Sequence, residues 1–270
     1  MNPKQKKALD DLHQEATDMD FIKEALRKSL VDPEEEITED PVILEITEPS
    51  GFKPIFTLGN FSAIIGQAKT KKSFFASMVL GTMARQRQYQ NLIPRIKGRC
   101  VLFDTEQGRY HVSKFAKRSM KIAGGKENFT IFALRPFDTE QRITLIEKVL
   151  YAEGWKFAII DGVRDLVTDI NNPDQATHIS NLLLKWTAER NLHIMCIIHQ
   201  NKADKNARGH IGSEVVNKSE TVISISKHDV EKDLTVVSPE FMRGLHFEPY
   251  EIKIEDDLPV CTGENENIPF

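Results

Sequence analysis

From about residue 42 the chain alternates short apolar runs with helical stretches, and this alternation constrains the fold more than any other feature. Such a pattern is typical of a parallel sheet whose strands are joined by crossover helices. We therefore expect an α/β fold with a mainly parallel central sheet. The candidate strands are residues 61–65, 99–104, 129–134, 156–161, 193–199 and 220–226.

The two ends of the chain differ from this central region. Residues 1–41 are rich in Lys, Asp and Glu, carry apolar residues at helical spacing, and end in the acidic stretch DPEEEITEDP. They predict a helical arm and a linker, and the arm could pack on the core or dock onto a neighbouring subunit. Two strand-like runs, LTVV and YEIKI, predict an antiparallel extension of a core spanning residues 42–258. We expect residues 259–270 to form a loose tail.

Composition excludes several classes of protein. The 270 residues are 40% hydrophobic, which is enough for a buried core, and the net charge of −4 argues against an overall basic nucleic-acid surface while allowing a local basic loop. The three cysteines lack metal-ligand spacing, so we expect reduced thiols and neither disulfides nor zinc. Without an apolar run of about 20 residues or a signal-like N-terminus, the sequence predicts a soluble, cytoplasmic protein and no membrane partner.

The stretch IIGQAKTKKSFF at residues 64–75 resembles a phosphate-binding loop between a strand and a helix. Gly66 would make the turn, Lys72 would reach the phosphates, and the Ser73 hydroxyl would bind Mg²⁺. Lys71 stands where the loop normally has its second glycine, so an ordinary helix start remains an alternative. The candidate nucleotide-binding residues are Gly66, Gln67, Ala68, Lys69, Thr70, Lys71, Lys72, Ser73 and Phe74.

Polar residues at three other strand ends could complete such a site. Asp161 ends KFAIID and could hold Mg²⁺ with Ser73, although buried strands commonly end in aspartate. Glu106 follows another strand and could polarise a water, although DTE is also typical of a solvated turn. The strand at 193–199 delivers His199, Gln200 and Asn201 to the same edge, where Gln200 could sense a γ-phosphate.

The polar segment that follows carries three basic residues, Lys202, Lys205 and Arg208. A loop that contacts a nucleic-acid backbone has this composition, and so does an ordinary surface loop.

Taken in order, these elements resemble the RecA-like ATPases, and among them the RepA-like hexameric helicases of plasmids and mobile elements, which are related to DnaB-type helicases. The resemblance covers about residues 45–256 and rests on SAIIGQAKTKKS, VLFDTEQG, FAIIDG, IIHQNK and RGHIGSEVVNKSETVI. It implies a RecA-like P-loop core that binds ATP and Mg²⁺ between subunits of a homo-oligomer, such as a hexameric ring, with single-stranded DNA as partner. The family's catalytic and binding roles carry over to Lys72, Ser73, Glu106, Asp161 and Gln200.

In this family a neighbouring subunit also supplies an arginine that stabilises charge on the transferred phosphoryl group. Arg243 in SPEFMRGLHF is the candidate, although Phe241 departs from the family's Lys-x-Arg pattern, and Arg243 could instead be an ordinary surface residue. On this resemblance we expect the family's N-terminal collar domain to be missing or reduced to the short arm.

Two functions follow as hypotheses. The first is a Mg²⁺-dependent ATPase, a DNA helicase or DNA-dependent ATPase, in the replication or mobilisation of a mobile element. The second is an ATP-binding regulatory or loading protein that hydrolyses little, which Lys71 and the short N-terminal arm favour.

Overall fold

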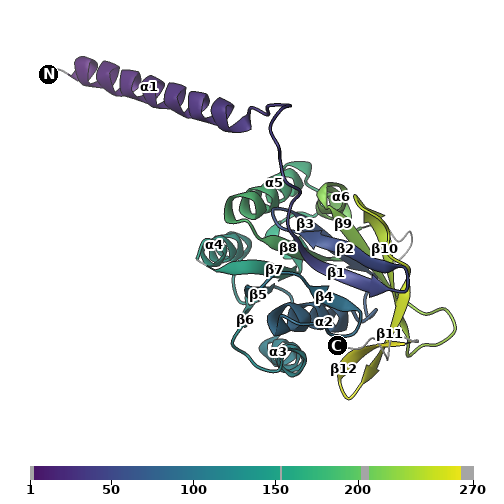
Figure 1. The fold of residues 1–270 in the computed structure, drawn as a ribbon. Helices are drawn as coiled ribbons and strands as arrows, with labels where there is room; N and C mark the ends of the chain where they lie inside the picture. The colour runs from purple at the N-terminus through teal and green to yellow at the C-terminus, as the bar shows by residue number, and fades with distance from the viewer. Residues whose placement is uncertain (1–2, 153, 202–206, 263–270) are drawn as a thin grey trace. The chain divides into compact units, whose positions relative to one another are not determined.

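The computed structural model describes residues 3–152, 154–201 and 207–262 (Figure 1). The chain divides into two units, Met1–Glu39 and Asp40–Phe270, close to the expected boundary after residue 41. In the first unit, helix α1 spans Pro3–Ser29, in agreement with the helical spacing of its apolar residues. Its side chains Met19, Ile22 and Leu26 are exposed.

A nine-stranded sheet forms the centre of the second unit, with strand order β12-β11-β10-β9-β3-β8-β7-β5-β6. All strand pairs from β9 to β6 are parallel, which confirms the expected α/β fold. These strands agree with the predicted ranges to within one residue at each end. They are β3 (Phe61–Gly66), β5 (Arg99–Asp104), β6 (Phe129–Ala133), β7 (Trp155–Asp161), β8 (His193–His199) and β9 (Thr221–Lys227).

Helices cover both faces of this sheet (Figure 1). An apolar cluster lies on each face of the sheet. One contains side chains of α2 and α3, and the other contains side chains of α4, α5 and α6. The caps predicted for two helices are present, because Asp138 forms a capping box with Gln141 and Asn172 caps the helix that begins at Pro173. The helices are α2 (Lys72–Arg85), α3 (Arg109–Ala123), α4 (Thr139–Leu150), α5 (Pro173–Arg190) and α6 (Gly209–Lys218), with a 3-10 turn η1 (Val163–Leu166).

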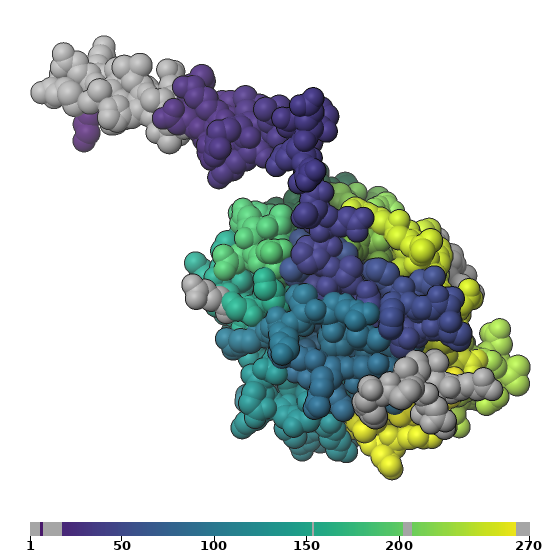
Figure 2. Space-filling model, in the orientation of Figure 1, coloured from purple at the N-terminus to yellow at the C-terminus, as the bar shows by residue number. Residues whose placement is uncertain are grey.

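A second, three-stranded antiparallel sheet was not expected from the sequence. Its strands β1 (Val42–Glu48), β2 (Gly51–Thr57) and β4 (Leu92–Pro94) lie in the order β2-β1-β4. Buried side chains such as Ile43, Leu44 and Phe56 join the same apolar cluster as α2. Figure 2 shows the β1 and β2 segments, in dark blue, on the face of the core turned toward the viewer.

Strands β10 (Thr235–Met242), β11 (Tyr250–Glu255) and β12 (Leu258–Thr262) extend the main sheet in antiparallel fashion. The prediction of a loose tail from residue 259 is therefore wrong as far as Thr262, and residues 263–270 lie outside the described part of the chain. Asp256 and Asp257 both adopt positive φ, the geometry of a two-residue hairpin turn. Arg118 of α3 ties this turn to the core, since its Nη2 lies 2.9 Å from Asp257 Oδ1.

Among the described residues, no helix has the length and apolarity that a membrane crossing requires.

Candidate functional site

The carboxyl ends of β3, β8, β7 and β5 lie side by side at one edge of the sheet. The register places Gly66 opposite His199 and Asp104 opposite Asp161. Next to these strand ends and the start of α2 lies a cavity of about 420 Å³. Its lining brings most of the predicted loop together with Glu106 and Asp161, and consists of Lys69, Thr70, Lys71, Lys72, Ser73, Phe74, Glu106, Gln107, Asp161, Ile197 and His199.

Gly66 is required at the first position of the loop. A Cβ on this residue would lie 2.4 Å from the carbonyl oxygen of Ile225 and 2.9 Å from Thr70 Oγ1, so any side chain would push the loop away from β9. The loop is also closed internally, because the Thr70 hydroxyl donates to the Gln67 carbonyl at 2.9 Å. Gln67 and Ala68, which were predicted to bind nucleotide, are not among the cavity's lining residues.

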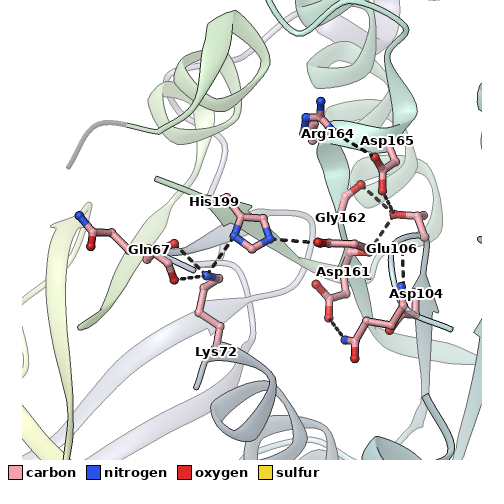
Figure 3. A network of polar contacts seen from close by, with 12 residues as sticks. Gln67, Lys72, Asp104, Glu106, Asp161, Gly162, Arg164, Asp165 and His199 are labelled. Carbon is pink, nitrogen blue, oxygen red and sulfur yellow. Dashed lines mark hydrogen bonds and ion pairs between the residues drawn. The ribbon is translucent and has the colours of Figure 1, made fainter. Parts of the chain in front are cut away.

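The Lys72 ammonium is held by the loop's own backbone. It donates to the carbonyl oxygens of Gly66 and Gln67, each at 2.8 Å, and lies 3.4 Å from His199 Nδ1 (Figure 3). Burial lowers the pKa of Lys72 to about 8, and the negative charges of Asp161 and Glu106 oppose this shift. The lysine is therefore still mostly protonated at neutral pH and offers a positive charge beside the cavity.

Lys71 adopts a backbone conformation that glycine takes most readily. Its φ of 64° and ψ of 25° are left-handed, a region that costs a residue with a side chain about 1 kcal/mol or more. Its ammonium donates to the carbonyl oxygen of Asp233, in the hairpin between β9 and β10, at 2.6 Å. The position thus keeps the loop's geometry, and its side chain connects the loop to that hairpin.

Two carboxylates, Glu106 and Asp161, line the cavity, and a third, Asp104, lies on the strand next to Asp161. Asp104 accepts from the backbone N–H groups of Glu106 and Gln107, which fixes the turn after β5. Burial raises the pKa of Asp161 to about 7, and the negative charges of Asp104 and Glu106 add to the shift. The Gln107 side chain reaches Asp161 Oδ2 at 3.4 Å, a long hydrogen bond that does little to compensate this burial.

The oxygen atoms of Asp161 and Ser73 fit Mg²⁺, which prefers oxygen ligands from one or two carboxylates together with phosphate. A bound cation would relieve the unfavourable burial of the Asp161 carboxylate, and the Ser73 side chain lines the same cavity. Within the described ranges, no group of three or more His, Cys, Asp or Glu residues is arranged to hold a metal without a ligand's help.

His199 is the residue that the sequence analysis did not assign to the site. Its Nε2 lies 3.1 Å from Glu106 Oε2, and this hydrogen bond is the main cause of the lowered pKa of Glu106. Gln200, the predicted γ-phosphate sensor, is not among the cavity's lining residues; its backbone N–H donates to the Gly66 carbonyl at 3.1 Å.

Two other predicted residues, Arg208 and Arg243, are not among the cavity's lining residues. Arg208 is exposed at the start of α6, and its backbone N–H donates to the His199 carbonyl at 3.0 Å, while Lys202 and Lys205 fall outside the described residues. Arg243 is exposed next to Met242, which pairs with the first residue of β9. It therefore lies at the amino edge of the parallel strands, opposite the edge that carries Lys72.

Known proteins resemble this chain at two levels. A family model described as an AAA domain matches residues 47–205, and no curated protein matches. Among solved structures, the KaiC-like protein PH0186 from Pyrococcus horikoshii OT3 is 16% identical to this chain, with a TM-score of 0.55. The match covers 77% of this chain and 91% of the PH0186 chain. The RadB recombinase is 12% identical with a TM-score of 0.54, covering 77% and 93%. With the family model spanning more than half of its length, the chain belongs to the AAA domain family, and its fold is that of the RecA-like P-loop ATPases.

Proposed function

We propose that this protein is a Mg²⁺-dependent ATPase of the RepA-like helicase type, acting on DNA in the replication or mobilisation of a mobile element. The observation that carries the proposal is the convergence of Lys72, Ser73, Asp161 and Glu106 on one cavity, from three separate segments of the chain. A positive charge, a hydroxyl and two carboxylates at the carboxyl edge of a parallel sheet are the groups that phosphoryl transfer needs.

The residues divide the chemistry between them. Lys72 would exchange the Gly66 and Gln67 carbonyls for phosphate oxygens, since both are acceptors for the same ammonium. Asp161 and Ser73 would hold Mg²⁺, which when bound neutralises charge on the phosphates. Glu106, whose pKa is lowered, is an ionised carboxylate at neutral pH and would orient a water and accept its proton.

The DNA-binding and assembly parts of the proposal have separate support. The basic segment with Lys202, Lys205 and Arg208 follows β8, one of the strands whose ends form the cavity, so a strand of DNA there would lie near the nucleotide. The helical arm α1, with apolar residues at helical spacing, would dock on a neighbouring subunit. Gln200 would sense the γ-phosphate from the same strand end, and Arg243 would serve a neighbour's site.

Hydrolysis assays with and without single-stranded DNA test this function. We expect Lys72→Ala and Glu106→Gln each to lower ATP turnover by about a hundredfold or more, because each removes a group that acts on the transition state. Lys97→Ala, which removes an exposed lysine from the turn before β5, should leave turnover unchanged. Full activity of either site variant would contradict the assignment.

A second candidate is an ATP-binding regulatory or loading protein with little hydrolysis. The left-handed Lys71 and its bond to Asp233 favour it, because a loop fastened to the β9–β10 hairpin would adjust slowly to the phosphates. Tight ATP binding with negligible turnover, unchanged by single-stranded DNA, would support this candidate over the first.

A further inference from the structure

His199 lies between the two charged groups that the proposed chemistry depends on. Its ring is 3.4 Å from the Lys72 ammonium on the Nδ1 side and 3.1 Å from the Glu106 carboxylate on the Nε2 side (Figure 3). It shares the lining of the cavity with Ile197, two residues earlier on β8, as the alternation of side chains along a strand requires. The histidine is therefore part of the cavity wall and contacts both groups directly.

The chemistry of the two partners determines which ring nitrogen carries the proton. An ammonium can only donate, so Nδ1 must accept from Lys72, and an ionised carboxylate can only accept, so Nε2–H must donate to Glu106. These contacts select one tautomer of the neutral imidazole, with the proton on Nε2. The shorter contact, to Glu106, determines this choice, and the long 3.4 Å contact with Lys72 agrees with it.

We propose that His199 is a positioning residue for Glu106, holding the carboxylate in one orientation through its Nε2–H group. The Glu106 side chain is 54% exposed, so without this hydrogen bond it would sample several rotamers in solvent. When the Lys72 ammonium donates to a phosphate instead, His199 loses its partner at Nδ1, and its Nε2–H still donates to Glu106. This inference rests on the proposed ATPase function, in which Glu106 orients the attacking water.

Two substitutions separate the two sides of the ring. In His199→Gln the side-chain amide nitrogen can occupy the place of Nε2 and donate to Glu106. In His199→Asn the shorter side chain reaches only the place of Nδ1 and cannot touch Glu106. We expect His199→Asn to lower kcat about ten- to a hundredfold, the range for a hydrogen bond to a charged group, with little change in KM for ATP. His199→Gln should retain most of the wild-type kcat.

Equal losses in the Asn and Gln variants would overturn the proposal, because a residue that only supports the fold would respond to both changes alike. A rise in KM with kcat unchanged would also overturn it, since His199 would then act on nucleotide binding. The same holds if His199→Asn is fully active.

A spectroscopic measurement on the full-length protein without nucleotide separates this proposal from the ATPase assignment. Nitrogen-15 NMR of the imidazole groups, with the His199 signal identified by its loss in His199→Asn, should show the Nε2–H tautomer near pH 7.5. Glu106→Ala should shift that signal. An Nδ1–H tautomer, or a signal insensitive to Glu106→Ala, would refute the positioning role even if the protein hydrolyses ATP. The expected tautomer in a protein without turnover would refute the ATPase function alone.

Discussion

Lys71 shows how one residue can preserve a loop's geometry while departing from its sequence pattern. The left-handed backbone that the loop needs is easiest for glycine, and here a lysine adopts it. Its ammonium donates to the Asp233 carbonyl, and this bond compensates part of the backbone cost. The departure from the pattern therefore alters what the loop is attached to, while its path stays that of a phosphate-binding loop.

This arrangement predicts that Lys71 contributes little to phosphate binding. Lys71→Gly should change the dissociation constant for ATP by no more than about threefold, because the strain it relieves and the tether it removes have opposite effects of about 1 kcal/mol. Lys71→Asn, which tolerates the left-handed region but cannot reach Asp233, isolates the tether. Titration calorimetry with ATP and Mg²⁺ measures both, beside Lys72→Ala, which should bind far more weakly. A loss in Lys71→Gly as large as that in Lys72→Ala would mean that Lys71 contacts phosphate.

At the scale of elements, the strands of the main sheet as far as β11 were predictable, whereas the small sheet and β12 were not. Four of the six parallel strands, β3, β5, β7 and β8, are almost entirely buried and mainly apolar, so their ranges follow from composition. The other two, β6 and β9, were recognisable from their apolar and β-branched residues. In the small sheet, β4 escaped because it has three residues and its partner β1 is far from it in sequence. Strand β12 escaped because its hairpin turn is built from two aspartates at positive φ, where asparagine and glycine are the usual residues.

The same distinction holds for the site. The strand ends identified Glu106 and Asp161 because a polar residue after a buried run must lie at the sheet's edge. The choice between His199 and Gln200 depends on which face of β8 borders the cavity. That face is set by the packing of Ile197 against its neighbours, which a single sequence does not specify.

The start of β9 is connected to the end of β2 through a buried carboxylate. Glu220 accepts from the Thr57 N–H at 2.7 Å and from the Thr57 hydroxyl at 2.5 Å. His193, 3.4 Å away, is neutral, because burial lowers its pKa to about 3. Burial also raises the pKa of Glu220 to about 7, so the folded protein favours the protonated form of this residue.

The sign of this shift predicts a pH-dependent effect of Glu220→Gln. Below the unfolded pKa of about 4.5, Glu220 is protonated in both states and costs no stability. As pH rises from there to about 7, the unfolded state ionises more readily, so the free energy of unfolding falls by up to about 3 kcal/mol. The variant does not titrate, so its stability relative to wild type should rise by about 1–3 kcal/mol between pH 5 and pH 8. Urea unfolding at both pH values measures the difference, with Glu214→Gln on α6 as control. An unchanged difference would show that Glu220 is ionised in the folded protein.

At the scale of the whole molecule, the positions of Lys72 and Arg243 constrain how a complete site could form. Lys72 follows the carboxyl end of β3, whereas Arg243 follows the strand β10 that returns to the amino end of β9. Within one chain, the two residues therefore lie at opposite ends of the parallel strands. An arginine from this position can act on a nucleotide only if a second copy brings it to the first copy's cavity.

Mixing two inactive variants tests whether the site is shared. Lys72→Ala and Arg243→Ala should each abolish turnover alone, because every site in such an assembly lacks one of the two groups. In an equal mixture, about a quarter of the interfaces would pair an intact Lys72 with an intact Arg243, so about a quarter of wild-type turnover should return. Mixing Lys72→Ala with Glu106→Gln is the matched control, since both defects lie in the same cavity and no pairing restores it. Absence of recovery in the first mixture, with assembly verified by light scattering in ATP and Mg²⁺, would exclude Arg243 as the residue supplied by a neighbour.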